Sequence, residues 1–263
     1  STKGRSTGMA LFAQGTYAVT DKLNIIAGMR YDLEKKKYNV LGEYQKDPDP
    51  NPLFETRPDT SASKNFSSFS PKLGIAYKIN AGSIVFAMYS RGYRTGGFTQ
   101  LSSDPSQPPL FAYQPQYSNN IEVGVKNTLF HNRVQFNAAV FYSTITDVQV
   151  PTLVLPDAIT VTKNAGKLNS KGFEMELSAI AVKGLDVDYN FGYTKAVYKN
   201  LKLAQYGNVT NLDGKKQIFT PDVTSMLAVQ YSYLLSKKLA LKLTARGEWK
   251  YAGKQYFDLS NSI

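Results

Sequence analysis

The sequence contains no cysteine and only one histidine among its 263 residues. The missing thiols exclude a disulfide scaffold, a zinc ribbon, an iron–sulfur cluster and a cysteine nucleophile from this stretch. Long hydrophobic runs are missing too. The longest, Ile84 to Tyr89, has six residues, whereas a transmembrane helix needs about 20. The first residues show no charged segment followed by an apolar one, so we expect no signal peptide here.

Charge is scarce, at 19% of residues, against a usual share of about a quarter. It is also unbalanced, because 31 Lys and Arg face 20 Asp and Glu, a net charge of +11. The basic residues are scattered and form no clustered stripe, so no nucleic-acid partner is expected. The positive balance instead favours an anionic ligand through long-range steering. Aromatic residues are abundant at 13%, which excludes a collagenous, low-complexity or strongly disordered chain.

Hydrophobic side chains alternate with polar ones along most of the chain. The clearest case is Leu239 to Tyr251, where every odd position is apolar or glycine and the even positions include Lys242, Arg246 and Glu248. Successive side chains of a strand point to opposite faces. The alternation therefore predicts a strand with one apolar face and one charged face.

The same period predicts ten strands joined alternately by tight turns and long links. The predicted strands cover residues 7–19, 23–38, 67–79, 83–92, 117–129, 133–146, 159–181, 184–198, 217–235 and 238–252. The tight turns are 20–22, 80–82, 131–132, 182–184 and 236–237, and the long links are 39–66, 94–116, 147–158 and 199–216. Long strands with short turns at one end and long loops at the other are typical of outer-membrane β-barrels. A soluble β-sandwich or β-solenoid is the alternative, since its strands also alternate.

Seven short motifs point to a specific family. In order, they are Phe69–Gly74 (FSPKLG), Tyr89–Phe98 (YSRGYRTGGF), Glu122–Lys126 (EVGVK), Asn137–Tyr142 (NAAVFY), Asn164–Lys167 (NAGK), Lys171–Leu177 (KGFEMEL) and Phe219–Pro221 (FTP). In this order and spacing, over about residues 7–257, the chain resembles the β-barrel of TonB-dependent outer-membrane receptors.

The resemblance implies an all-β fold, an antiparallel transmembrane β-barrel of the 22-stranded, plugged class. Ten strands in 263 residues is about 26 residues per strand. At that rate a barrel of 22 strands would need about 570 residues. We therefore expect residues 1–263 to be an interior part of a single TonB-dependent receptor barrel domain. No plug domain, energy-coupling box or closing strand with a terminal aromatic residue is recognised in the sequence.

The resemblance also implies a function. The chain would belong to an active-transport receptor in the outer membrane of a Gram-negative bacterium, which binds a scarce nutrient and imports it with TonB-coupled energy. A ferric siderophore is the first candidate, with haem, cobalamin and glycans as others. The implied partners are outer-membrane lipid, lipopolysaccharide, the ligand, and the TonB complex through a plug. No enzymatic activity, cofactor or metal site is expected. A passive porin or structural barrel, and less so an omptin-like protease, remain as alternatives.

Ligand binding is expected at the long link 94–116 and its flanks, on aromatic and polar side chains. The candidates are Tyr93, Arg94, Phe98, Gln100, Phe111, Tyr113 and Tyr117. Aromatic rings beside an arginine suit an anionic or aromatic chelate, and Gly96 and Gly97 would let the loop hinge. The alternative is a lid that packs only on neighbouring loops.

A second set of charged residues is expected to line the lumen or face the plug. It comprises Arg30, Lys126, Glu174, Glu176, Asp186, Asp188, Lys242 and Arg246. Paired carboxylates can perform acid–base chemistry, but this spacing places them on one face and favours a solvated ion network. By resemblance, the acids near Glu174 would meet basic residues of a plug. The lone His131 lies in a predicted turn without a catalytic partner, and Lys35–Lys37 could contact lipopolysaccharide phosphates.

Overall fold

The computed structural model describes residues 2–49, 51–99, 110–154, 159–164, 166–205 and 208–262. All regular structure in these residues is β-strand, and every pairing of strands is antiparallel. Within the same residues no helix is long and apolar enough to cross a membrane. The all-β, antiparallel fold expected from the sequence is confirmed.

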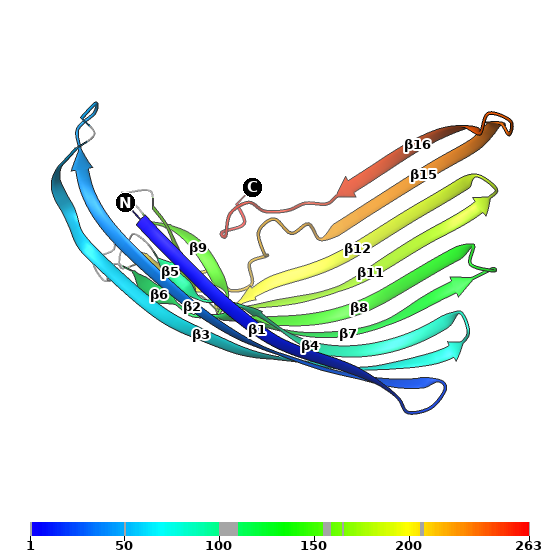
Figure 1. Cartoon of the computed structure of the whole chain (residues 1–263), viewed down its shortest axis with the longest axis horizontal. Coiled ribbons are helices and arrows are strands. Elements are labelled where there is room, and N and C mark those ends of the chain that lie inside the picture. Colours follow the sequence, from blue (N-terminus) through cyan, green and yellow to red (C-terminus); the bar gives the residue numbers. More distant parts are fainter. Residues whose placement is uncertain are drawn as a thin grey trace.

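Ten long strands form one sheet, with the order β1-β2-β3-β4-β7-β8-β11-β12-β15-β16. Their bounds are β1 (Thr2–Ala18), β2 (Leu23–Gln45), β3 (Pro52–Asn80), β4 (Ser83–Arg94), β7 (Gln116–Leu129), β8 (Val134–Thr146), β11 (Lys167–Val182), β12 (Leu185–Lys199), β15 (Val223–Ser236) and β16 (Leu241–Ala252). Figure 1 shows the sheet as a strongly curved, open trough with β1 and β16 at its two edges. Ten strands were expected, and ten are found.

Five tight turns connect these strands at one end of the sheet. Thr20 stabilises the first, because its hydroxyl accepts hydrogen bonds from the backbone N–H groups of Lys22 (3.2 Å) and Leu23 (3.0 Å). In the second, Asn80 Oδ1 accepts from Gly82 N at 2.9 Å. His131 lies in the turn between β7 and β8 with φ of 57°. These side-chain contacts replace backbone hydrogen bonds that a chain reversal leaves unmade.

Several predicted boundaries were wrong in the sheet, among them the start of the first strand, which lies at Thr2 and not at residue 7. Most of the predicted link 39–66 belongs to β2 and β3, whose ladder runs from Leu23↔Tyr77 to Gln45↔Pro52. Polar side chains on both faces hide the alternation there, while backbone hydrogen bonds continue the ladder regardless of side chain. The predicted strand 217–235 begins only at Val223.

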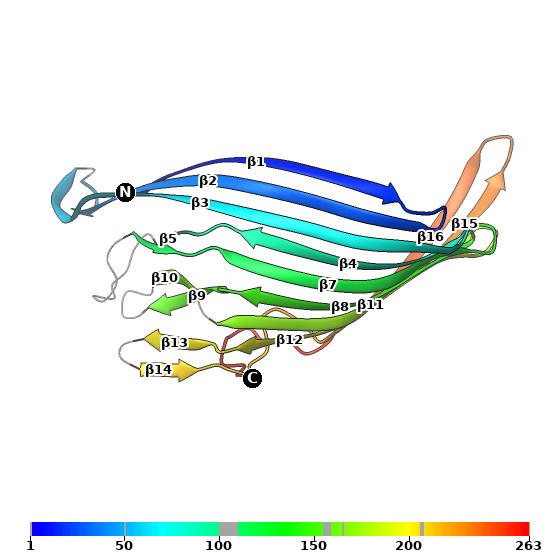
Figure 2. The same ribbon diagram turned by 90° about the horizontal axis from the view of Figure 1, so that it is seen from below.

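The long links hold three additional two-stranded hairpins. They are β5 (Gly97–Thr99) with β6 (Phe111–Tyr113), β9 (Gln149–Val154) with β10 (Ile159–Asn164), and β13 (Lys202–Gln205) with β14 (Asn208–Asn211). Figure 2 shows them at the end opposite the tight turns. The predicted strand 159–181 is thus two strands, interrupted at Gly166, whose φ of 56° is strained for residues with a side chain.

The register of the ladder separates two faces of the sheet. One face, here called the outer face, is apolar along most of its height, with Phe173 directly opposite both Val140 and Tyr193. The other, here called the inner face, carries the strand carboxylates, for example Glu174 and Glu176. All eight carboxylates in the regular parts of the ten strands share it: Asp32, Glu34, Glu122, Glu174, Glu176, Asp186, Asp188 and Glu248.

The hairpins pack on the inner face. Leu168, on the same face of β11 as Glu174, and Tyr198 of β12 belong to a buried cluster with residues of the long links. The cluster contains Val148, Val150, Leu168, Ala196, Tyr198, Leu201 and Leu212. A second cluster joins Val40 to Phe98 and Leu110. The buried core of the described chain is therefore small and lies at the hairpin end.

Candidate functional site

Two predicted ligand-binding tyrosines meet at the hairpin end of β4 and β7. Tyr93 and Tyr117 are directly opposite in the ladder, and their ring centroids lie 5.7 Å apart with a 39° tilt. The guanidinium carbon of Arg91 lies 4.4 Å from the centroid of the Tyr117 ring. We call these three residues the rim group. A cation over an aromatic face is held by the ring quadrupole, so the group combines a positive charge with two phenol rings.

The Phe98 side chain packs inside the protein and is not open to a ligand. It is buried, with 8% of its surface exposed, and its ring lies 5.7 Å from that of Tyr38. Tyr38 is itself directly opposite Gly4, where an added Cβ would lie 2.8 Å from the Tyr38 ring. The contacts of Tyr38 with Gly4 and with Phe98 thus connect β1, β2 and the β5–β6 hairpin.

Gly96 and Gly97 allow a close approach between backbone and side chains. Neither has a φ in the left-handed region, and a Cβ on Gly97 would collide with the Tyr113 hydroxyl. A Cβ on Gly96 would collide with the Phe66 ring and with the Tyr113 carbonyl. The pair therefore packs the hairpin tightly against its surroundings, which is a different role from the hinge that the sequence suggested.

The remaining candidates differ in accessibility. Phe111 is 38% exposed, and Arg94 is exposed at the end of β4. Tyr113 is half-buried, and burial raises the pKa of its hydroxyl, an effect that the nearby positive charge of Arg94 opposes. Gln100 lies outside the described residues. Arg94 and Phe111 are thus the candidates most open to a ligand.

Gln149 is a site residue that the sequence analysis missed. Its side chain is buried, and Nε2 donates hydrogen bonds to the carbonyls of Thr95 (2.8 Å) and Gln114 (3.1 Å). Asn164 adds a bond from Nδ2 to the same Gln114 carbonyl at 2.9 Å. These amides tie the β9–β10 hairpin to the link that carries the binding candidates. No local pattern marks an isolated amide for this role.

The predicted lumen residues all lie on the inner face. In its middle, Lys126 Nζ lies 5.6 Å from the centroid of the Phe86 ring, and Asn137 Nδ2 donates to Glu176 Oε2 at 3.3 Å. These side chains line a recess with Glu122 and Glu174. The recess brings three carboxylates near one lysine and so favours a basic partner.

A second charged group lies on β11, β12 and β16, on both sides of β15. Arg246 Nε lies 2.8 Å from Glu248 Oε1, and Lys250 Nζ lies 3.3 Å from Glu248 Oε2. Ser178 donates a hydrogen bond of 2.8 Å to Asp188. At the other side of the trough, Arg30 pairs with Asp32 at 2.7 Å. Asp186 and Lys242 share this face, with no ion pair among the described residues. The arrangement is an exposed ion network rather than an isolated catalytic carboxylate pair.

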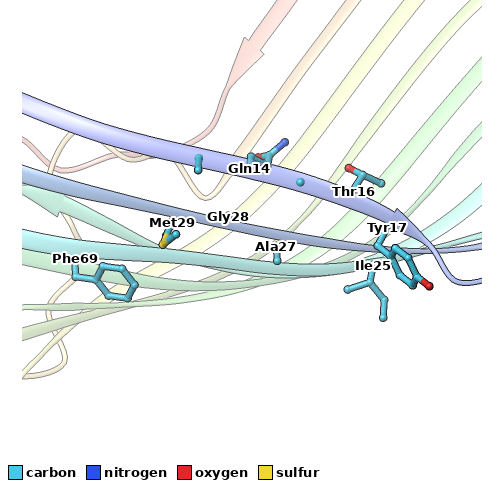
Figure 3. Close-up of a pocket in the computed structure, with 10 residues that line it drawn as sticks. Gln14, Thr16, Tyr17, Ile25, Ala27, Gly28, Met29 and Phe69 are labelled. Carbon is cyan, nitrogen blue, oxygen red and sulfur yellow. The ribbon is translucent and has the colours of Figure 1, made fainter.

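A surface hollow along β1 and β2 does not form a site. Figure 3 shows Gln14 and Thr16 pointing to one side of the sheet while Tyr17 and Ile25 point to the other. Side chains that diverge in this way cannot converge on one ligand. Within the part of the chain that the structure describes, no group of three or more His, Cys, Asp or Glu residues could hold a metal ion.

Comparison with known proteins identifies a family and relatives with similar sequences. The family model described as TonB dependent receptor-like, beta-barrel matches residues 1–263. Among curated proteins, the metal-pseudopaline receptor CntO of Pseudomonas aeruginosa is 23% identical over 205 residues, covering 78% of this chain and 26% of CntO. The chain therefore spans about a quarter of that relative's length.

Solved structures share the fold over nearly the whole chain. The ferric yersiniabactin uptake receptor FyuA from Yersinia pestis superposes with a TM-score of 0.76 at 21% identity, covering 99% of this chain and 36% of FyuA. The siderophore receptor PiuA from Acinetobacter baumannii gives a TM-score of 0.74 at 16% identity, covering 99% of this chain and 35% of PiuA. At these identities the similarity concerns the fold.

Proposed function

The chain belongs to the TonB-dependent receptor-like β-barrel family, and from this premise we propose that it forms part of the wall of an outer-membrane receptor that imports a scarce nutrient with TonB-coupled energy. The family consists of transport receptors of Gram-negative outer membranes, not of enzymes. In this assignment the apolar outer face contacts lipid and the charged inner face lines the lumen. The hairpin end faces the cell exterior, where loops on a rigid scaffold bind ligand.

A ferric siderophore is the cargo that we propose. The relatives named above include receptors for yersiniabactin, for a siderophore and for metal–pseudopaline. The net charge of +11 supports an anionic chelate. The contact surface would be Arg94 together with Phe111. The rim group lies on the outer face, where Tyr117 is level with Lys167 through Thr146. The observation that carries this part is the exposure of Arg94 and of the Phe111 ring at the hairpin end, because a cation and an aromatic ring suit an aromatic or anionic chelate.

The proposed partners follow from the two faces. A plug with basic residues would meet the inner-face recess around Glu122, Glu174 and Glu176, and through it the TonB complex would supply energy. Outer-membrane lipid and lipopolysaccharide would surround the outer face. A passive porin and an omptin-like protease have weaker support, since the matched family consists of energy-coupled receptors and His131 lies in a tight turn.

Whole-cell uptake tests energy coupling. Labelled ferric siderophores are supplied to cells that express the full-length receptor, with and without an active TonB. Uptake is expected only with active TonB. Equal uptake in both strains would contradict energy coupling and favour a passive pore.

A matched pair of phenylalanine variants tests the contact surface. Phe111→Ala removes an exposed ring, and Phe98→Ala removes a buried one. The first should weaken ligand binding while leaving protease resistance of the hairpin unchanged. The second should reduce protease resistance. Arg94→Gln provides a further binding variant, and unchanged affinity in both Phe111→Ala and Arg94→Gln would remove this hairpin from the binding site.

A further inference from the structure

Two pairs of lysines face each other across β11 and β12. The register places Lys171 directly opposite Lys195, and Lys167 directly opposite Lys199. Side chains opposite each other on antiparallel strands have Cβ atoms about 5 Å apart. Like charges in this position are destabilising. Two such pairs on one pair of strands therefore call for a compensating anion.

These four lysines lie on the outer face. Each is an even number of residues from Phe173 or Tyr193, which belong to the apolar face, and all four are exposed. Among the described positions on the outer face of β7, β8, β11 and β12 there is no Asp or Glu. The carboxylates of these strands are on the inner face, beyond the backbone.

Among the residues that the structure describes, no carboxylate pairs with these lysines. The ion pairs of the described residues involve none of the four. The carboxylate of Asp222, next along the sheet, is bound by Lys216, which forms a bridge with Val197 between the two lysine pairs. The Asp222 carboxylate is thus already paired and does not compensate the four lysines.

Apolar side chains adjoin the lysines on the side of the tight turns. Tyr142 is directly opposite Lys171 and is 46% exposed. Val140 and Tyr193 are exposed one step further along the strands. Aromatic rings at this level mark the interface between headgroups and hydrocarbon in outer-membrane barrels. The lysines therefore stand where lipid headgroups begin.

We propose that Lys171, Lys195, Lys167 and Lys199 form a binding site for the phosphates of lipopolysaccharide, whose acyl chains lie on Val140, Tyr142 and Tyr193. This proposal rests on the outer-membrane orientation proposed above. Positions 167 and 171 are about 13 Å apart along the strand, so each lysine pair can hold its own phosphate of one headgroup. Lysine ammonium groups bind phosphate as mobile point charges.

The test uses the full-length receptor purified in detergent. Lys171→Gln/Lys195→Gln removes one outer pair, and Lys36→Gln/Lys64→Gln is the matched control, because Lys36 and Lys64 are also directly opposite but lie on the inner face. Binding of purified lipid A is measured by native mass spectrometry, beside dephosphorylated lipid A and inorganic phosphate. Heat-modifiable migration verifies folding, and Lys171→Arg/Lys195→Arg keeps the charge.

The outer variant should bind lipid A about tenfold to thirtyfold more weakly, while the control and the arginine variant bind it like the parent protein. Dephosphorylated lipid A should bind the parent more weakly still, because it lacks the phosphates that both lysine pairs would hold. Equal loss in the control, or unchanged binding in the outer variant, overturns the proposal. If inorganic phosphate binds as tightly as lipid A, the site binds a free anion and is not specific for the lipid. Siderophore uptake by the same variants is scored separately, so a failure of the transport assignment is distinguished from a failure of this site.

Discussion

Arg246 on β16 reaches over an intervening strand to Asp188 on β12, with Nη1 3.8 Å from Oδ2. The strand between them is β15, and the residue opposite Asp188 there is Ala228, which is fully buried. A small side chain at this place leaves the path between the two charges open. The Arg246–Asp188 contact therefore links β12 and β16 across β15 on the inner face.

A double-mutant cycle should measure this contact. Asp188→Asn combined with Arg246→Gln is expected to give a coupling free energy of about 0.2–1 kcal/mol, because both side chains are more than a third exposed and water screens the pair. The measurement is a urea titration of the full-length receptor refolded into lipid vesicles. Asp188→Asn with Lys242→Gln serves as control and should show no coupling. A coupling equally large in the control would mean that the energy is not specific to this pair.

Arginine substitutions at neighbouring positions should distinguish the two faces. Val140 is at the midpoint of β8 and is 53% exposed on the outer face, while Ala139 is on the inner face opposite Glu174. Val140→Arg is expected to destabilise the folded receptor by about 1–3 kcal/mol, because it places a charge in the hydrocarbon between the headgroup level of Tyr142 and the bilayer midplane. Ala139→Arg should cost less. Similar midpoints for both variants in refolding titrations would contradict the facing assignment.

Removing the Gln149 amide should loosen the link between β4 and β7. Gln149→Leu leaves the carbonyls of Thr95 and Gln114 without this donor, a loss of about 1–3 kcal/mol for buried groups. Hydrogen exchange of residues 110–116 is expected to accelerate, while exchange in β8 stays unchanged. Gln135→Leu, at an exposed position near the tight turn, is the control. If both variants exchange like the parent, Gln149 does not anchor this link.

Acid should release the segment that follows β16. Hydrogen bonds from Ser260 and Ser262 lower the pKa of Asp258 to about 2, below its ordinary value of about 3.9. A lowered pKa means that the ionised carboxylate favours the ordered segment, so this stabilisation is complete above the ordinary pKa and disappears as pH falls through about 2.

Hydrogen exchange of residues 258–262 between pH 5 and pH 1.5 measures this release. Asp258→Asn should make their protection independent of pH in that range. A pH dependence that survives in Asp258→Asn would assign the effect to another group.

The sequence predicted the sheet well because side-chain alternation and tight-turn chemistry are local signals. Leu239 to Tyr251 alternates cleanly, and Thr20 and Asn80 mark their turns. The extension of β2 to Gln45 was missed because backbone hydrogen bonds carry that ladder through residues without alternation. The break at Gly166 was missed because the Lys199 and Asn200 carbonyls, which leave no room for a Cβ at position 166, approach it from more than 30 residues away in the sequence.

The candidate site was only partly predictable for a similar reason. Tyr93 and Tyr117 could be proposed from composition, and the ladder brings them together. Phe98 has the same chemistry but packs against Tyr38, and nothing in its neighbours along the chain distinguishes the two situations. Gln149 acts through carbonyls more than 30 residues away. Contacts at such separations are set by the register of the sheet, not by local sequence.

The contact of Gly4 with Tyr38 sets a rule for how related sequences can differ. The three atoms closest to a Cβ at position 4 all belong to the phenol group of Tyr38, so a larger residue at position 4 requires a smaller one at position 38. The Tyr38 ring also contacts Phe98, and a smaller residue at 38 would leave a gap there. In an alignment of relatives, positions 4, 38 and 98 should therefore change size together, with the sum of their volumes nearly constant.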